Sequence, residues 1–498
     1  MKKILKQNLK LNLIITLGTS ISGFILNGYF SKYMGLETLG LMRLFTQIIA
    51  YLNLADMGIG MASAYALYRP LSERNQDQIN IIIATINYFY KRVALVILLV
   101  GLLLNVMLHN FIKVNSYGHM LYIFWSLYVI NTSISYLYAK YPILFTANQE
   151  FNKVRMIQGS GRIVFQILQI IFMIKTQSFL IFILIMILEN LYLYIFYNYN
   201  DKINYKIDKV KIIDKNLIKD TKNLFWHKLA GVIVFNTDYI VLSKFVSLSI
   251  IGIYSSYLMI YQMLIILIGI ITDALTPIMG KYVAENTKED IYKKWNEIYI
   301  IYFYISTFLI ICTYYLITPF IKLWLGEEYV LPKISVILIL INLFIQMIRG
   351  VTDIFKTVSG FFDDIYAPFL EGILNLIFSL IMVQKMQLNG VIIGTLISNL
   401  VIILILKPIL VFKKCFEQKG IKYLKTLMEY FSLSILSMIS IDCFINKVFK
   451  LSLNNINNWI IWFYKAISVG IISLIIVTII FILNNDFRKI LNKNRFKT

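Results

Sequence analysis

Cysteine and histidine are scarce in this chain, which has only three of each among its 498 residues. A glycine-rich loop ending in Lys-Ser or Lys-Thr, which would hold the phosphates of a nucleotide, is missing. We therefore expect no metal, no cofactor and no nucleotide hydrolysis by the chain itself. The six residues stand singly, without the spacing of a disulfide framework or a metal site: Cys312, Cys415, Cys443, His109, His119 and His227.

Charged residues are also few. They make up 15% of the chain against 59% hydrophobic residues, and the mean hydropathy of +0.72 excludes an ordinary soluble globular protein. Runs of about 20 apolar residues, enough to cross about 30 Å of hydrocarbon, recur throughout. No segment between them is long enough for a soluble domain. We count fourteen spans, near 11–30, 41–66, 88–110, 119–140, 158–175, 179–197, 224–246, 250–276, 297–318, 334–355, 366–384, 389–411, 426–446 and 458–483.

The sequence contains an internal duplication. The stretch SKYMGLETLG, from Ser31 to Gly40, returns as SKFVSLSIIG, from Ser243 to Gly252, and the register then holds for about forty residues more. Each copy has six spans, an even number, so both copies enter the membrane from the same side. The predicted fold is an all-α polytopic membrane protein of about 14 transmembrane helices, with two parallel six-helix bundles and a C-terminal helix pair.

The predicted domains follow from this map. We expect an N-terminal bundle at 1–200, a basic cytoplasmic linker at 201–223 and a C-terminal bundle at 224–412. The extra helix pair is expected at 426–483 and a cytoplasmic tail at 484–498. The first apolar run has no small-residue cleavage site, so we expect no cleavable signal peptide.

Basic residues predict the orientation. Most of the 48 Lys and Arg fall in segments on the same side as the N-terminus, which the positive-inside rule assigns to the cytoplasm. Both termini are therefore expected inside. The net charge of +22 reflects this bias together with attraction to anionic lipids, rather than nucleic-acid binding.

Ionisable residues inside the spans are the candidates for function, because a charge in hydrocarbon is costly unless it meets water or a partner. A buried ion pair and a polar cavity between the bundles both remain open as explanations. When the two copies are aligned at the repeat offset, Arg43 aligns with Ser255, and Asp238 aligns with Leu26. Each of these charged residues therefore has an uncharged counterpart. Charges present in one copy only favour a functional site over a shared scaffold. The candidates are Arg43, Arg162, Arg349, Asp56, Glu189 and Asp238.

Other basic residues near span ends are expected to be interfacial anchors whose ammonium or guanidinium groups reach the headgroups. We assign this role to Lys140, Arg155, Lys228 and Lys407.

The beginning of the chain resembles a known family. The stretch SKYMGLETLGLMRLF followed by YLNLADMGIGMASAYALYRPLSERNQDQI looks like the start of bacterial polysaccharide exporters of the Wzx flippase type. These belong to the multidrug/oligosaccharidyl-lipid/polysaccharide (MOP) exporter superfamily, with the MATE drug exporters and the lipid II flippase. The glycines of this stretch suit the polysaccharide branch better than the drug branch.

The resemblance implies a flippase that moves undecaprenyl-diphosphate-linked oligosaccharide across the bacterial cytoplasmic (inner) membrane for surface polysaccharide synthesis. It would work by alternating access of two bundles and would not be an enzyme. Arg43, Arg162 and Arg349 are then the candidates for binding diphosphate and sugar, because guanidinium binds phosphate oxygens in a fork. A glycan polymerase and a chain-length regulator are possible protein partners.

Coupling to an ion gradient would require acidic side chains inside the spans. Asp56, Glu189 and Asp238 are the acids placed to titrate with a proton or sodium gradient. Drug exporters of the superfamily typically carry an acid in the first span, and this chain has none there. The alternatives are a MATE-like exporter of small cations, which should have a more acidic cavity, or a membrane-bound glycan polymerase, which generally needs a larger extracytoplasmic loop.

Overall fold

The computed structural model describes residues 2–53, 59–111, 117–204, 237–361, 364, 366–445, 456 and 458–495. Regular structure in this part of the chain is helical throughout. The chain forms two compact units, Met1–Gly252 and Ile253–Thr498. Ten described segments are long and apolar enough to cross a membrane. The prediction of an all-α polytopic membrane fold is confirmed.

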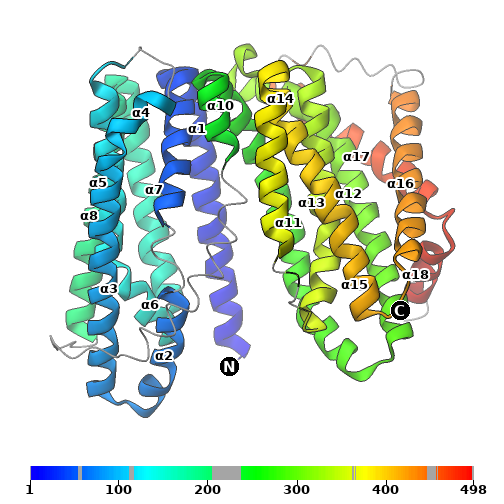
Figure 1. The fold of residues 1–498 in the computed structure, drawn as a ribbon, viewed down its shortest axis with the longest axis horizontal. Helices are drawn as coiled ribbons and strands as arrows, with labels where there is room; N and C mark the ends of the chain where they lie inside the picture. The colour runs from blue at the N-terminus through cyan, green and yellow to red at the C-terminus, as the bar shows by residue number, and fades with distance from the viewer. Residues whose placement is uncertain are drawn as a thin grey trace. The chain divides into compact units, whose positions relative to one another are not determined.

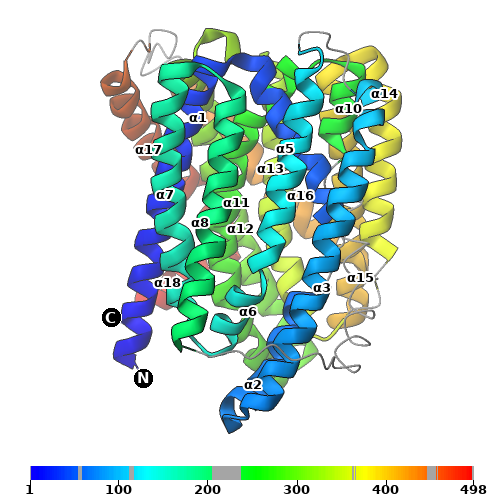
Figure 2. The same cartoon turned by 90° about the vertical axis from the view of Figure 1, so that its left-hand side faces the viewer.

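Unit 1 is built on long helices that run side by side (Figure 2). Its core lies where α3 packs on α5 and α5 packs on α8. Here Tyr197 stacks on Tyr138 and Tyr141, with ring centroids 5.8 and 6.1 Å apart. The helices are α1 (Lys2–Leu52), α2 (Ile59–Glu73), α3 (Gln76–Leu103), α4 (Asn105–Phe111), α5 (Met120–Tyr138), α6 (Lys140–Ala147), α7 (Phe151–Thr176), α8 (Phe179–Asn204) and α10 (Asp238–Phe245).

Unit 2 is likewise a bundle of long helices, coloured green to red in Figure 1. An aromatic core joins α12, α15 and α16, where Trp295 packs on Tyr299 and Phe412 with ring centroids 4.3 and 4.7 Å apart. Helix α11 (Leu248–Glu285) begins in unit 1 and continues into unit 2. The remaining elements are α12 (Lys288–Leu325), a 3₁₀ turn (Glu327–Tyr329), α13 (Lys333–Val358), α14 (Tyr366–Ser398), a π-helix (Asn399–Leu406), α15 (Lys407–Cys415), α16 (Gly420–Cys443), α17 (Trp459–Phe481) and α18 (Asn485–Arg495).

Equivalent helices of the two copies begin at equivalent residues. Asn75 caps α3 by accepting a hydrogen bond from the backbone N–H of Gln78 at 3.1 Å. Thr287 caps α12 in the same way, accepting from the N–H of Asp290 at 3.3 Å. Both residues of the second cap stand 212 positions after their counterparts. The duplication therefore extends to the hydrogen bonds that start the helices.

Two of the long helices contain a sharp bend. In α1 the bend is at Gly35, whose backbone angles are φ 79° and ψ 173°, a conformation that glycine adopts without a steric penalty. In α14 it is at Gln387, with φ 49° and ψ −126°. Each bend lies between two spans that the sequence predicts. Each of these helices therefore consists of two straight segments, its two arms, which meet at the bend.

Candidate functional site

The bend at Gly35 brings the two arms of α1 together at Arg43. Asn27 and Arg43 each lie eight residues from Gly35, and the Arg43 guanidinium donates to Asn27 Oδ1 at 2.7 Å. The amide nitrogen of Asn27 donates to the Gly23 carbonyl at 2.7 Å, which fixes the amide with its oxygen toward Arg43. The arginine is thus held by a polar residue of the first span.

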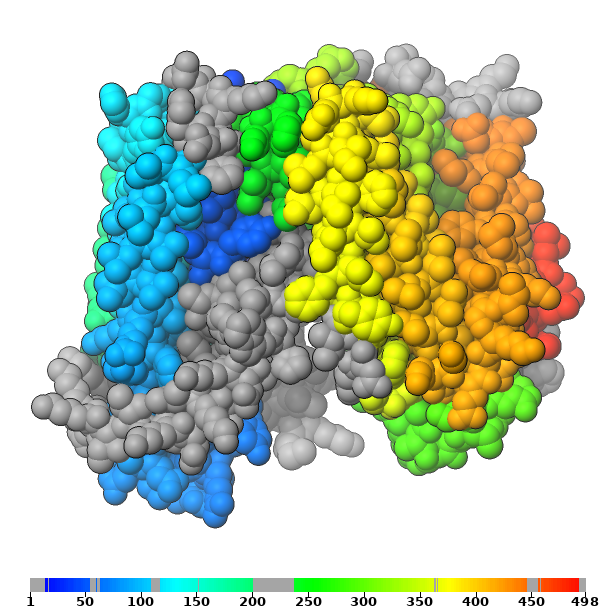
Figure 3. Space-filling view, in the orientation of Figure 1, coloured from blue at the N-terminus to red at the C-terminus, as the bar shows by residue number. Residues whose placement is uncertain are grey.

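Arg43 and Asp238 share a neighbourhood in unit 1. Arg43 interacts electrostatically with Tyr128 of α5 and Tyr239 of α10. Asp238, in the first turn of α10, acts on the same Tyr239 and on Tyr51 of α1. Helix α10 packs against α1 (Figure 3). Two of the predicted site residues, separated by 195 positions in sequence, therefore lie around one tyrosine.

A second polar cluster joins α7, α8 and α5. Arg162 of α7 acts electrostatically on Glu189 of α8. Beside Glu189, Asn190 donates to Asn131 Oδ1 at 2.8 Å and accepts from the Tyr138 hydroxyl at 2.6 Å. The cluster thus combines one predicted anion-binding residue and one predicted coupling acid with hydrogen-bonded amides.

Arg349 lies in unit 2 within a network of charges. Its guanidinium contacts the carboxylate of Asp353 at 2.7 Å and approaches Glu371 of α14 at 4.0 Å. Glu371 also faces the ammonium group of Lys407 at 3.6 Å. The side chains of Lys407 and Glu371 are only 4% and 5% exposed. Two cations and two acids therefore balance one another, and the charge of Arg349 is already opposed by carboxylates.

The assignment of Lys407 to the membrane interface is wrong. Its ammonium group is buried and faces Glu371 of α14. Glu371 was not among the predicted site residues. The repeat comparison does not reach them, because both lie beyond the stretch over which the register holds.

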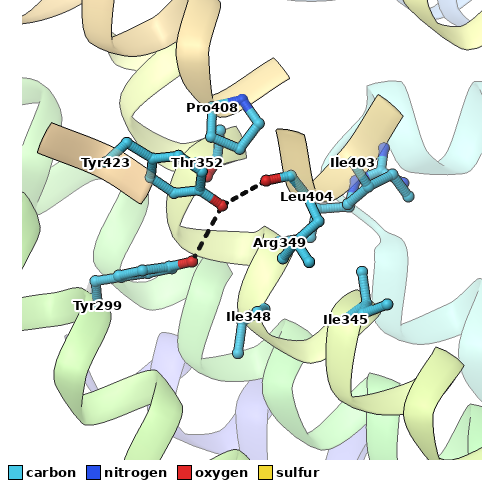
Figure 4. A pocket seen from close by; sticks show the side chains of 9 residues that line it. All are labelled: Tyr299, Ile345, Ile348, Arg349, Thr352, Ile403, Leu404, Pro408 and Tyr423. Carbon is cyan, nitrogen blue, oxygen red and sulfur yellow. Dashed lines mark hydrogen bonds between the residues drawn. The ribbon is translucent and has the colours of Figure 1, made fainter. Parts of the chain in front are cut away.

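A π-helix precedes Lys407, and its wider turn is supported from the side (Figure 4). The Tyr423 hydroxyl donates to the Leu404 carbonyl at 2.7 Å and lies 3.4 Å from the Tyr299 hydroxyl. Asn399, at the start of the π-helix, donates to Asn342 Oδ1 at 2.8 Å. Such π segments are frequent at functional sites. This one ends directly before Lys407, which faces Glu371.

The recess next to the π-helix is not an open cavity in this structure. The space between its lining side chains, about 160 Å³ including the gaps between atoms, has no room for a water molecule. Arg349 is one of the residues that line it, together with Thr352 and apolar and tyrosine side chains (Figure 4). The recess is therefore a packing gap beside the charge network.

The other predicted residues and sites stand as follows. Asp56 lies outside the described residues. The described residues contain no group of three His, Cys, Asp or Glu side chains that could hold a metal ion. Of the remaining five candidates, the structure groups Arg43 with Asp238 and Arg162 with Glu189, and it places Arg349 with two acids. The roles of all six remain predictions.

The chain is similar to known proteins in sequence and in fold. A family described as "Polysaccharide biosynthesis protein" matches residues 5–283. The lipid II flippase MurJ, in an inward closed conformation, is 15% identical with a TM-score of 0.70, covering 95% of this chain and 98% of that one. An inward-facing multidrug resistance transporter of the MATE family in the MOP superfamily is 14% identical with a TM-score of 0.61, covering 85% and 98%.

A third structure, a mutant of the Vibrio cholerae MATE transporter VcmN, is 15% identical with a TM-score of 0.52, covering 84% of this chain and 99% of that one. No curated protein matches the sequence. At these identities, the likeness to solved structures shows a shared fold alone.

Proposed function

Because the chain belongs to the family of polysaccharide biosynthesis proteins, we propose that it is a flippase for undecaprenyl-diphosphate-linked oligosaccharide. It moves this lipid across the bacterial cytoplasmic membrane, with both termini in the cytoplasm, and works by alternating access of two bundles. The bundles proposed are those at 1–200 and 224–412, joined by the linker 201–223. The family match is the observation that carries the proposal.

The chemistry of the substrate agrees with the composition of the chain. A diphosphate and a large sugar cannot cross hydrocarbon, so they need a polar passage, while the polyprenyl tail stays in lipid. The fold that this chain shares with the lipid II flippase supports a passage of that kind. We assign the chain to transport rather than catalysis, with a glycan polymerase and a chain-length regulator as its protein partners.

Among the arginines, Arg43 is the foremost candidate for the diphosphate. Its guanidinium is oriented by the hydrogen bond to Asn27, and a guanidinium suits the two oxygens of a phosphate group. Arg162 is exposed on α7 and is the second candidate. Arg349 is already opposed by Asp353 and Glu371, so it is the weakest of the three.

Export of small cations is the rival function, and the fold shared with MATE transporters favours it. A site for cations should be lined mainly by acids. In unit 1, Arg162 interacts electrostatically with Glu189. Arg43 and Asp238 both interact electrostatically with Tyr239. Each described candidate acid of this unit therefore has an arginine nearby. This balance favours an anionic substrate.

Depletion of the chain tests the flippase proposal. We expect lipid-linked oligosaccharide to accumulate on the cytoplasmic leaflet and surface polysaccharide to fall, because translocation is blocked after the lipid intermediate is made. The measurement is extraction of lipid-linked glycan together with its accessibility to an added glycosidase. Re-expression should restore both. Unchanged surface polysaccharide after complete depletion would refute the proposal.

Coupling to an ion gradient is proposed for Glu189 and Asp238, and also for Asp56. We expect Asp238→Asn to lower transport about tenfold and to abolish its response to an imposed proton gradient, because an amide cannot release a proton. The measurement is flipping in proteoliposomes with and without the gradient, and Asp77→Asn, in the first turn of α3, is the control. The response to the gradient should be tested with each of Asp56, Glu189 and Asp238 neutralised in turn. A response that persists in all three variants would rule out these acids.

A further inference from the structure

The two copies of the repeat touch each other through their own equivalent glycines. A Cβ atom built on Gly40 would overlap the Leu248 backbone, lying 2.6 Å from its carbonyl carbon. A Cβ atom built on Gly252 would lie 2.5 Å from the Leu36 carbonyl oxygen. Distances below 3.0 Å do not occur for real Cβ atoms. Glycine is therefore required at both positions for the helices to approach this closely.

This contact is reciprocal. Leu248 stands 212 residues after Leu36, and Gly252 stands 212 residues after Gly40. Each glycine thus lies against the leucine that precedes, by four residues, the other copy's glycine. A contact of this form is what a two-fold axis between two copies produces. The close approach of backbones at small residues is the usual way in which membrane helices associate.

Side chains around the contact are tightly buried. Leu39 and Leu41 of α1 are 2% and 0% exposed, and Leu248 and Ile251 of α11 are 1% and 0% exposed. The first turn of α11 is also capped, since Ser247 Oγ accepts from the N–H of Ile250 at 3.3 Å. The contact is therefore a well-packed joint in unit 1, where all these residues lie.

Beyond this contact, most of the side chains of α11 are partly or fully exposed. Only 6% of its most apolar 18-residue window is buried, and residues such as Met263, Ile266 and Ile270 are 61–65% exposed. The chain passes into unit 2 within this helix, directly after Gly252. Helix α11 is thus closely packed at its start and partly or fully exposed over most of the apolar window that follows.

We propose that the reciprocal contact of Leu36 and Gly40 with Leu248 and Gly252 is a clasp that closes the outer side of the transporter. The outer location rests on the proposed topology, in which the segment around Gly35 connects two spans outside the cytoplasm. The clasp is closed in this structure. Outward release of the substrate requires the first turn of α11 to separate from α1, and the two glycines set how tightly the turns close.

A buried reporter tests the clasp independently of the substrate. The three native cysteines are replaced by serine, Ile251→Cys is introduced, and a membrane-impermeant maleimide is added from outside to intact cells. We expect slow labelling in this parent. Gly40→Ala and Gly252→Ala should each speed labelling about tenfold or more, because an added methyl group overpacks the contact and separates the helices. The two variants should behave alike, since the positions are equivalent.

Gly269→Ala is the matched control, because Gly269 lies in the same helix with nothing within 4 Å of an added Cβ. It should leave labelling unchanged. Rapid labelling of the parent, or unchanged labelling in folded Gly40→Ala and Gly252→Ala, would overturn the clasp. If only one of these variants folds, that variant still tests the contact, because both glycines belong to it. Labelling that responds as expected in a protein that moves no lipid-linked glycan would support the clasp and refute the proposed function.

Discussion

Replacing Arg43 with alanine is expected to lower transport of the lipid-linked glycan about tenfold to a hundredfold, because a charge-assisted hydrogen bond contributes roughly 1.5–3 kcal/mol. The loss should appear mainly as weaker binding of the diphosphate. Arg43→Lys should retain part of the activity, since lysine keeps the charge but lacks the fork that binds two phosphate oxygens. The measurement is flipping of a short-chain undecaprenyl-diphosphate glycan in proteoliposomes, with protein level checked in parallel.

Two companion variants separate binding from general damage. Asn27→Ala should lower transport less than Arg43→Ala, because it removes only the group that orients the guanidinium. Arg69→Ala is the matched control, since this arginine of unit 1 has a side chain 85% exposed and pairs with Glu73 at a helix surface. It should transport normally. Normal transport by folded Arg43→Ala would remove this residue from the substrate site.

The overall architecture could be predicted from sequence because it depends on patterns that repeat along the chain. Apolar runs give the spans, and the offset of 212 residues relates Asn75 to Thr287. Both residues cap their helices as the repeat implies. Local signals of this kind need no knowledge of how distant helices pack. The domain boundaries remain predictions.

The candidate site could be predicted only in part. The rule that charges peculiar to one copy are functional candidates selected Arg43 and Asp238, which the structure places around Tyr239. Sequence could not give this proximity, because it depends on the bend at Gly35 and on the packing of α10 against α1. Nor could it show that Asn27 is the partner of Arg43.

Lys407 shows why a charge near the end of a span is difficult to interpret. It stands shortly before Lys413 and Lys414, where a snorkelling lysine is the ordinary expectation. Its burial depends on Glu371, 36 residues earlier in the chain, and on the bend at Gln387 that returns the second arm of α14 along the first. Only the three-dimensional arrangement identifies this pair.

Glu371→Gln is expected to destabilise the protein by roughly 3–5 kcal/mol, the usual cost of removing one partner from a buried ion pair. Lys407 is 4% exposed and would lose the carboxylate that its ammonium group faces. The double variant Glu371→Gln with Lys407→Met should recover most of the loss, because no unpaired charge then remains. The measurement is thermal unfolding in detergent, monitored by tryptophan fluorescence.

Glu285→Gln is the control for that experiment, since Glu285 pairs with Lys281 at 3.9 Å with both side chains more than half exposed. An exposed pair contributes about 0–1 kcal/mol, so this variant should unfold with the parent. A Glu371→Gln protein as stable as the parent would show that the pair carries little of the stability of unit 2. A double variant no more stable than Glu371→Gln alone would show that the unpaired charge of Lys407 is not the cause. Recovery in the double variant, by contrast, would make Lys407 and Glu371 a structural pair.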